Sequence, residues 1–194
     1  GADEFVWIGL LEPSDEELAS VGACFGLHPL AMEDAQHALL QLPKLEHYGD
    51  QLFLILRTAV LEERKIVYGQ TFIFLGEHFI VTVRHGASRT YGRIRAQLES
   101  APETLKQGPD FVLHSIMDFV VDGYLPVVET LEDMALAREA TAGDNFLDRD
   151  GIRQIFEMRR EVIRFQRVLG VMNDVAAQPV HHPLPTIAPE MLPY

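Results

Sequence analysis

The hydrophobic pattern of this chain changes its period near residue 105, and this change limits the folds that the chain can adopt. Before it, short apolar stretches with a period of two alternate with short helical stretches. From Pro109 to about Ala140, apolar residues recur every three or four positions, which is typical of a helix with one buried face. A second stretch of this kind runs from about Asp148 to Ala177. We therefore expect a layered α/β or α+β unit followed by two long helices.

The first hundred residues predict a mixture of strands and short helices. We expect strands at 5–11, 51–60, 68–75 and 78–84, and helices at about 14–25, 29–36 and 89–100. The capping-box pair Ser14 and Glu17 predicts where the first helix begins, and Pro29 suits the first turn of the second helix. Gly76 and Glu77 separate the last two strands, which predicts a β-hairpin with a two-residue turn.

The two long helices are expected to pack antiparallel, and they carry opposite charges. The first carries Glu129, Glu132, Asp133 and Glu139, and the second carries Arg153, Arg159, Arg160, Arg164 and Arg167. Because helices joined by a short loop are normally antiparallel neighbours, these two faces could meet. The alternative is two independently solvated faces whose charges contribute little. Pro126 lies within the first helix and predicts a kink there.

Charge and composition exclude several classes of partner. The formal net charge of the 194 residues is −13 at pH 7, which argues against binding to nucleic acid or to anionic lipid. No apolar run approaches the roughly 18–20 residues that a membrane-spanning helix requires. Cys24 is the single cysteine, so an intramolecular disulfide and a cysteine-based zinc site are excluded, and a cytosolic compartment is expected.

The sequence lacks the signatures of common enzymes. It has no P-loop, no dinucleotide-binding fingerprint, no Gly-x-Ser-x-Gly elbow and no His-Glu-x-x-His motif. Its histidines are scattered, and no nucleophile is paired with a base by its spacing. We therefore predict that the chain is not an enzyme and that it has no catalytic residues.

Three carboxylates are the candidate metal ligands. Glu33 and Asp34 are adjacent on a short predicted helix, where neighbouring residues point about 100° apart and suit a hydrated ion better than a tight chelate. Asp118 lies in an apolar stretch with Asp122 one turn further on, and a buried carboxylate would need a partner or a cation. Oxygen ligands without thiolates or clustered imidazoles point to Mg²⁺ or Ca²⁺. The alternative for all three is a solvated helix face.

Several stretches together resemble the cytoplasmic domain of CorA-type magnesium transport proteins. The resemblance is carried by Trp7-Ile8, Pro43-Lys44, residues 25–34 (FGLHPLAMED) and residues 111–124 (FVLHSIMDFVVDGY). It implies an α/β/α sandwich with a mixed sheet at 1–105, a long helical hairpin at 106–178 and a Pro-rich tail at 179–194. It also implies a stalk helix and two membrane helices beyond Tyr194.

The resemblance further implies a regulatory function in a homopentamer at the cytoplasmic face of the cell membrane. Mg²⁺ between neighbouring subunits would favour the closed state, with Glu33, Asp34 and Asp118 matching the family's acidic positions. The stalk aspartate and the Gly-Met-Asn signature of the family are not among these residues, and Leu42 replaces a basic residue before Pro-Lys. Two alternatives stay open: the cytoplasmic domain of a ZntB-like zinc transporter, and a free-standing acidic protein-interaction module.

Overall fold

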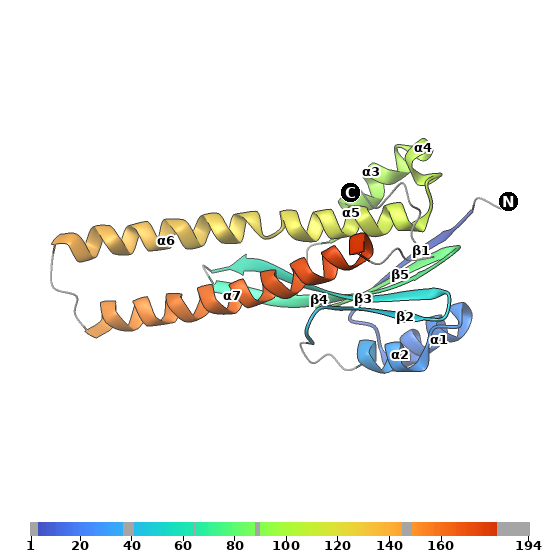
Figure 1. Cartoon of the computed structure of the whole chain (residues 1–194), viewed down its shortest axis with the longest axis horizontal. Helices are drawn as coiled ribbons and strands as arrows, with labels where there is room; N and C mark the ends of the chain where they lie inside the picture. The colour runs from blue at the N-terminus through green and yellow to red at the C-terminus, as the bar shows by residue number, and fades with distance from the viewer. Residues whose placement is uncertain (1–3, 37–40, 64, 88–89, 145–148, 182–194) are drawn as a thin grey trace.

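Twelve helices and strands make up the described part of the chain. The fold is taken from a computed structural model, which describes residues 4–36, 41–63, 65–87, 90–144 and 149–181 (Figure 1). The strands are β1 (Val6–Leu11), β2 (Lys44–Tyr48), β3 (Gln51–Glu62), β4 (Lys65–Gly76) and β5 (Phe79–Gly86). The helices are α1 (Asp15–Phe25), α2 (Pro29–Gln36), α3 (Gly92–Glu99), α4 (Pro102–Leu105), α5 (Pro109–Asp122), α6 (Leu125–Asp144) and α7 (Arg149–His181).

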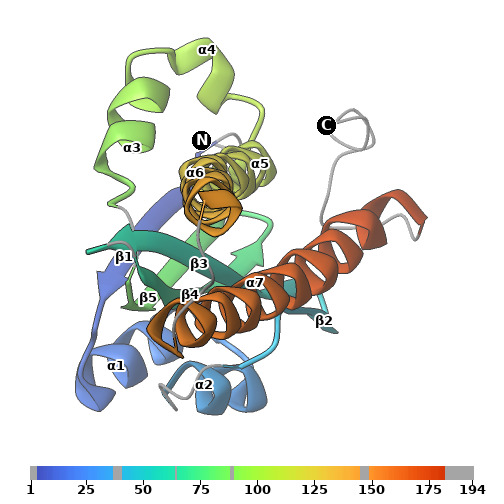
Figure 2. The same cartoon turned by 90° about the vertical axis from the view of Figure 1, so that its left-hand side faces the viewer.

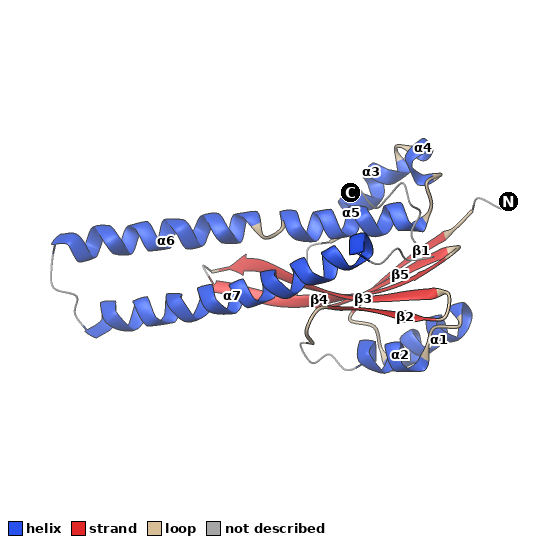
Figure 3. Ribbon diagram, viewed as in Figure 1, coloured by secondary structure: helices blue, strands red, loops and turns tan. Residues whose placement is uncertain are grey.

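The five strands form one mixed sheet in the order β1-β5-β4-β3-β2. β1 runs parallel to β5, and the other three pairs are antiparallel. β3 and β4 continue past their neighbours as a two-stranded ribbon, paired from Leu52 and Leu75 out to Glu62 and Lys65. Helices cover both faces of this sheet, which confirms the expected α/β/α sandwich with a mixed sheet (Figure 3).

Alternating side chains of the strands give the sheet two apolar faces. Phe53 and Ile55 of β3 are buried with α1 and α2 on one face, together with Phe72, Phe74, Val81 and Val83. Leu52, Leu54 and Leu56 of the same strand are buried on the other face, against α3, α5, α6 and α7. The period of two therefore sorts adjacent residues into two separate cores.

Helices α1 and α2 form the thinner covering layer. Ser14 and Glu17 make the reciprocal hydrogen bonds of a capping box at the start of α1, as their spacing predicts. Gly26 ends α1 in the left-handed conformation, with φ of 60°. Leu18 of α1 and Ala31 and Ala35 of α2 are buried against the sheet.

The opposite layer contains the long helices. α5 and α6 follow each other across the sheet, and α7 returns beside them over β2 and β3 (Figure 2). The predicted first long helix is interrupted at Gly123 and Tyr124, between α5 and α6, and it does not kink at Pro126 itself. Pro126 has no N–H to donate and its ring would clash with the carbonyl of Asp122, so a continuous helix has to end in the turn before it.

The outer parts of α6 and α7 extend beyond the sheet as an antiparallel pair (Figure 1). In the described residues, the ion pairs of α7 join Arg153 to Asp150 and Glu157, and Arg164 to Glu161, all within the same helix. Glu129, Glu132, Asp133 and Glu139 of α6 are exposed. The acidic and basic faces are therefore solvated independently, which is the second of the two expected arrangements.

Some boundaries differ from the prediction. β2 was not predicted, because only one of its five residues, Leu45, is strongly apolar. The turn between β4 and β5 consists of Glu77 and His78, one residue later than expected, since Gly76 pairs with Phe79. α3 begins three residues late, α4 was not expected, and α7 continues to His181. Residues 182–194 of the predicted tail lie outside the described residues, and the three-part division of the chain stays a prediction.

One stretch in the described part of the chain, residues 109–140, is long and apolar enough by length and composition to cross a membrane. Its mean hydropathy reaches 1.5. Val112, Ile116 and Val120 of this stretch are buried against the sheet, and the break at Gly123 and Tyr124 divides it. The buried apolar side chains of this stretch therefore belong to the core of the sandwich, whereas Val121, Leu125 and Leu136 are exposed.

Candidate metal centre

Glu33 and Asp34, the predicted acidic pair, lie on helix α2. The small side chains of Ala31 and Ala35 seat this helix on the sheet, and both are buried. Because successive helical residues point about 100° apart, the two carboxylates lie at different angles from the buried face of the helix. Glu33 is exposed and Asp34 is half-buried. α2 therefore presents one carboxylate to solvent and one toward the neighbouring edge strand.

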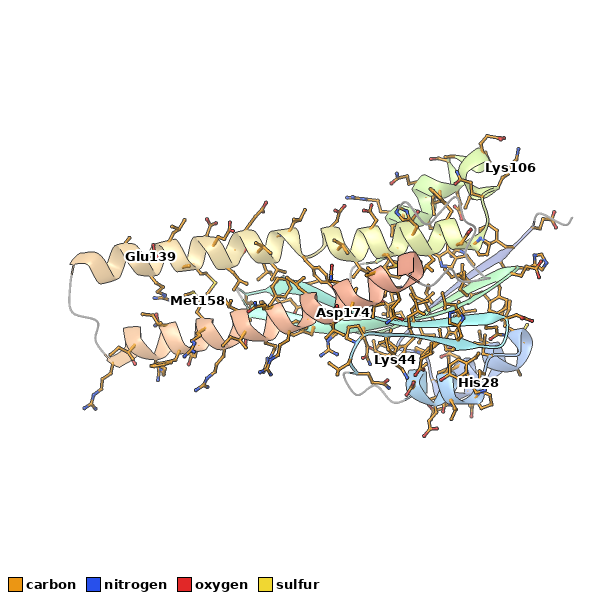
Figure 4. The ribbon with its side chains drawn as sticks, in the orientation of Figure 1. His28, Lys44, Lys106, Glu139, Met158 and Asp174 are labelled. Carbon is orange, nitrogen blue, oxygen red and sulfur yellow. The ribbon has the colours of Figure 1, made fainter. Side chains whose placement is uncertain are left out.

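The carboxylate of Asp34 has a cationic partner, Lys44 of β2, which the sequence analysis did not identify. Lys44 Nζ lies 2.7 Å from Asp34 Oδ2 and 2.8 Å from Glu46 Oε2, and it lies between the sheet and α2 (Figure 4). The hydroxyl of Tyr48 donates to the same oxygen of Glu46 at 2.8 Å. Burial lowers the pKa of Lys44, but its hydrogen bonds to Asp34 and Glu46 and their charges outweigh burial and raise the pKa above its ordinary value. Lys44 is therefore charged at neutral pH and neutralises part of this acidic cluster.

A sequence signal for this cluster exists in the spacing of β2. Lys44, Glu46 and Tyr48 alternate along five residues, and alternate residues of a strand share one face. The following Gly49 and Asp50 form the two-residue turn into β3, another signal of a hairpin. Because most residues of the strand are polar, neither the alternation nor the turn led to the prediction of β2.

Asp118, the third predicted ligand, lies on α5. Val112, Ile116 and Val120 of this helix point to the sheet and are buried, whereas Asp118 is exposed. Asp122, one turn further on, is exposed as well. The apolar residues around Asp118 in the sequence thus belong to the buried face of α5, and its carboxylate stays in water.

The sheet separates the predicted ligands within one chain. α2 packs on one face with the core that contains Phe53, and α5 packs on the other face with the core that contains Leu52 (Figure 2). Across the described ranges, no three His, Cys, Asp or Glu side chains come close enough together to hold a metal ion. Within a single chain the predicted oxygen ligands are therefore divided into two groups, the α2 pair and Asp118, which we call the two part-sites, and their role in metal binding stays a prediction.

The sequence of residues 2–194 matches the model of one protein family, described as CorA-like Mg²⁺ transporter protein. The chain belongs to this family. A Bacillus subtilis (strain 168) protein named "Putative metal ion transporter YfjQ" is 31% identical over 170 residues, which are 87% of this chain and 52% of that protein. The "Cobalt/magnesium transport protein CorA" of Thermotoga maritima is 20% identical over 177 residues, 90% of this chain and 50% of that protein. This CorA-like chain thus spans about half the length of these curated relatives.

Solved structures of CorA-like proteins share the fold. The soluble domain of CorA from Methanocaldococcus jannaschii matches with a TM-score of 0.81 at 22% identity, over 97% of this chain and 75% of that one. The ZntB cytoplasmic domain from Vibrio parahaemolyticus matches with a TM-score of 0.70 at 12% identity, over 96% of this chain and 74% of that one. At these identities, the likeness concerns the fold of the CorA-like chain and leaves its cation open.

Proposed function

We propose that this chain is the cytoplasmic, Mg²⁺-sensing part of a CorA-like divalent-cation transporter, and that the ion binds where two copies of the chain meet. Glu33 and Asp34 of one copy and Asp118 of the next supply carboxylate oxygens, and water molecules complete the coordination shell. The role is regulatory and not enzymatic. Bound Mg²⁺ favours the closed state of a homopentamer at the inner face of the cell membrane, as the family resemblance implies.

The observation that carries this proposal is the separation of the two part-sites by the sheet. Ligands on opposite faces of one chain cannot share an ion within that chain, but they can do so across a contact that uses a different surface of each copy. Such heterologous contacts form a ring when the rotation between neighbouring copies closes. Exposed carboxylates also leave room for the waters that Mg²⁺ retains. A ring of identical copies would therefore bring the two part-sites together at every contact.

The regulatory effect follows from differential affinity. Carboxylates that face each other across a contact repel, and a dication between them removes this repulsion. An ion that binds only the arrangement with closed contacts shifts the population toward that arrangement, by no more than its difference in affinity for the two states. Loss of the ion would then loosen the ring and favour the open transporter.

A Mg²⁺ titration of the chain tests the binding step, because a ligand of the native state raises the melting temperature. We expect a saturable rise at millimolar Mg²⁺, accompanied by association of copies in sedimentation velocity. The triple variant E33Q/D34N/D118N should lose both responses. The matched control E129Q/E132Q/D133N removes the same charge from exposed positions of α6 and should keep both.

Two results would contradict the proposal: a flat wild-type response up to tens of millimolar Mg²⁺, or an equal loss in the α6 control. The same titration with Zn²⁺ examines the zinc alternative. A Zn²⁺ response that survives the triple substitution would indicate a separate site with a preference for zinc.

A further inference from the structure

Four arginines line one pocket between β3 and α7. Arg57 comes from β3, and Arg160, Arg164 and Arg167 come from α7. The pocket has a volume of about 400 Å³, and its remaining lining consists of Gln41 and four apolar residues. None of its lining residues is an aspartate or glutamate, although the chain as a whole has a net charge of −13. Positive charge is therefore concentrated here against the average of the molecule.

Arg57, one of the lining residues, is held in place by two contacts. Its Nη1 donates to the backbone oxygen of Gln41 at 3.0 Å, and its guanidinium lies 5.7 Å from the centre of the Tyr68 ring. Its Nε is buried and has no hydrogen-bond partner among the described residues. Burial lowers the pKa of Arg57, and the positive charge of Arg164 acts in the same direction. Arg57 therefore gives the pocket a guanidinium that is fixed in position, and such a group is suited to forked hydrogen bonds with an anion.

The arginines of α7 share one face of the helix, because their spacing of four and three residues brings them together. Arg160 and Arg167 make no ion pair or hydrogen bond within the described part of the chain, and Arg164 has a loose contact of 3.6 Å with Glu161. Arg153, outside the pocket, is by contrast paired with Asp150. Arg159 lies outside the pocket and also makes no ion pair among the described residues, so the pocket is distinguished by gathering Arg160, Arg164 and Arg167 with Arg57.

We propose that this pocket binds a multiply charged phosphate ester of the nucleoside di- or triphosphate class. Guanidinium groups bind phosphate oxygens through forked hydrogen bonds, and several of them match the several charges of a polyphosphate. The rim carries Leu42 and Ile163, which are 74% and 38% exposed. These apolar side chains suit the uncharged part of such a ligand. None of the carboxylates of the proposed cation site lines the pocket, although Gln41 of its lining donates Nε2 to the backbone oxygen of Asp34 at 3.0 Å.

Calorimetric titration of the chain with ATP and with pyrophosphate tests the proposal. EDTA and constant ionic strength keep the result independent of the proposed Mg²⁺ site. We expect saturable binding, which R160Q/R167Q weakens at least tenfold. The matched control R153Q/R159Q removes the same charge from α7 outside the pocket and should bind as the wild type does. R57K keeps the charge but loses the forked geometry, so it should also bind more weakly.

Melting temperatures without ligand establish that the variants fold. A second arm distinguishes a free phosphate ester from a lipid headgroup, by sedimentation with phosphatidylcholine vesicles that contain or lack phosphatidylinositol phosphates. Binding of ATP supports the proposal, and binding to the phosphorylated vesicles alone would overturn it in favour of a lipid headgroup. No saturable binding in either arm, or equal losses in the two double variants, would overturn the proposal. Self-association that needs Arg160 and Arg167 but no phosphate would overturn it in favour of the acidic face of a second copy.

Discussion

Lys44 takes, within one chain, the place that a divalent cation would take beside Asp34. Its ammonium group is within hydrogen-bond distance of both Asp34 and Glu46. About a third of each of the side chains of Lys44 and Asp34 is exposed, and ion pairs in such positions contribute about 1 kcal/mol or less. A dication bound at the proposed site would therefore have to compete with Lys44 for Asp34. Lys44 would thus set the Mg²⁺ concentration at which the proposed sensor responds.

Replacement of Lys44 by glutamine should tighten Mg²⁺ binding. The variant removes a positive charge next to the proposed ligand, so the concentration for half-maximal response should fall roughly threefold to tenfold. The titration of melting temperature against Mg²⁺ measures this shift. K106Q is the control, since Lys106 pairs with Glu103 and lies far from α2 (Figure 4). Equal midpoints in K44Q and K106Q would show that Asp34 does not bind the ion.

Two glycines should respond to the same substitution with opposite signs. A Cβ on Gly69 would lie 2.3 Å from the backbone oxygen of Ala87, so β4 and β5 would have to separate. G69A should therefore destabilise the chain by about 1–3 kcal/mol in urea unfolding. Gly170 lies in the middle of α7 with nothing within 4 Å of such a Cβ, and G170A should stabilise it by about 0.5–1 kcal/mol. An unchanged stability in G69A would contradict the close approach described at Gly69, and a loss in G170A would contradict the open surroundings of Gly170.

Among the elements, the interruption between α5 and α6 is the point at which the helical layer is bonded to the sheet. Tyr124 stands in this break, is 4% exposed, and donates its hydroxyl to the backbone oxygen of Arg57 in β3. Its ring also packs against Phe165 of α7 at a centroid distance of 5.6 Å. One side chain therefore ties β3, the break and α7 together.

Removal of the Tyr124 hydroxyl should weaken this joint. Y124F leaves the carbonyl of Arg57 without this donor and should cost about 0.5–1.5 kcal/mol of unfolding free energy. Y68F is the matched control, because the hydroxyl of Tyr68 is buried without a hydrogen-bond partner among the described residues. Its removal should leave the stability unchanged or slightly raised. Urea unfolding of both variants checks the comparison, and equal costs would refute it.

Across the whole molecule, Glu12 connects parts that are far apart in the sequence. Its carboxylate accepts hydrogen bonds from Gly86 N at 2.7 Å and from His85 Nδ1 at 2.9 Å, at the end of β5. The other ring nitrogen of His85 lies 3.1 Å from the carbonyl oxygen of Ala35 in α2. β1, β5 and α2 are thus linked at one end of the sheet. Glu12 has a φ of 46°, an uncommon conformation for a residue other than glycine, and these bonds hold it there.

The Glu12 link should make stability depend on acid pH. The hydrogen bond from Gly86 and then the bond and charge of His85 lower the pKa of Glu12 below 4.5. Because the pKa of Glu12 is lower in the folded state than in the unfolded state, its ionised carboxylate stabilises the fold. This stabilisation is complete above about pH 4.5, the ordinary pKa, and is lost as the pH falls through the pKa of the folded state. Since 56% of the side chain is exposed, the gain should stay below about 1 kcal/mol.

Melting curves of wild type and E12Q measure this contribution. They are recorded from about pH 3 to about pH 7, a range that includes the ordinary carboxyl pKa. E12Q should melt at a lower temperature than the wild type above the ordinary pKa of Glu12. The difference should shrink as the pH falls below it. A difference that stays constant over the whole range would mean that the charge of Glu12 does not contribute.

The sequence by itself determined the type of every element except β2 and α4, and for the strands and long helices it also indicated the side that is buried. The period of two places Phe53 and Leu52 on opposite faces of β3. The spacing of Val112, Ile116 and Val120 gives α5 one apolar face. These features depend on geometry within a few residues, so they can be read along the chain. Gly49-Asp50 was such a signal as well, but the polar residues of β2 outweighed it.

Only the tertiary structure decided how residues far apart in the sequence meet. It placed Glu33 and Asp118 on opposite sides of the sheet, brought Lys44 to Asp34, and gathered Arg57 with the arginines of α7. These relations depend on strand order, on the layer that each helix joins and on the register between strands. No local pattern encodes them, because they result from burying all apolar faces of the chain at once.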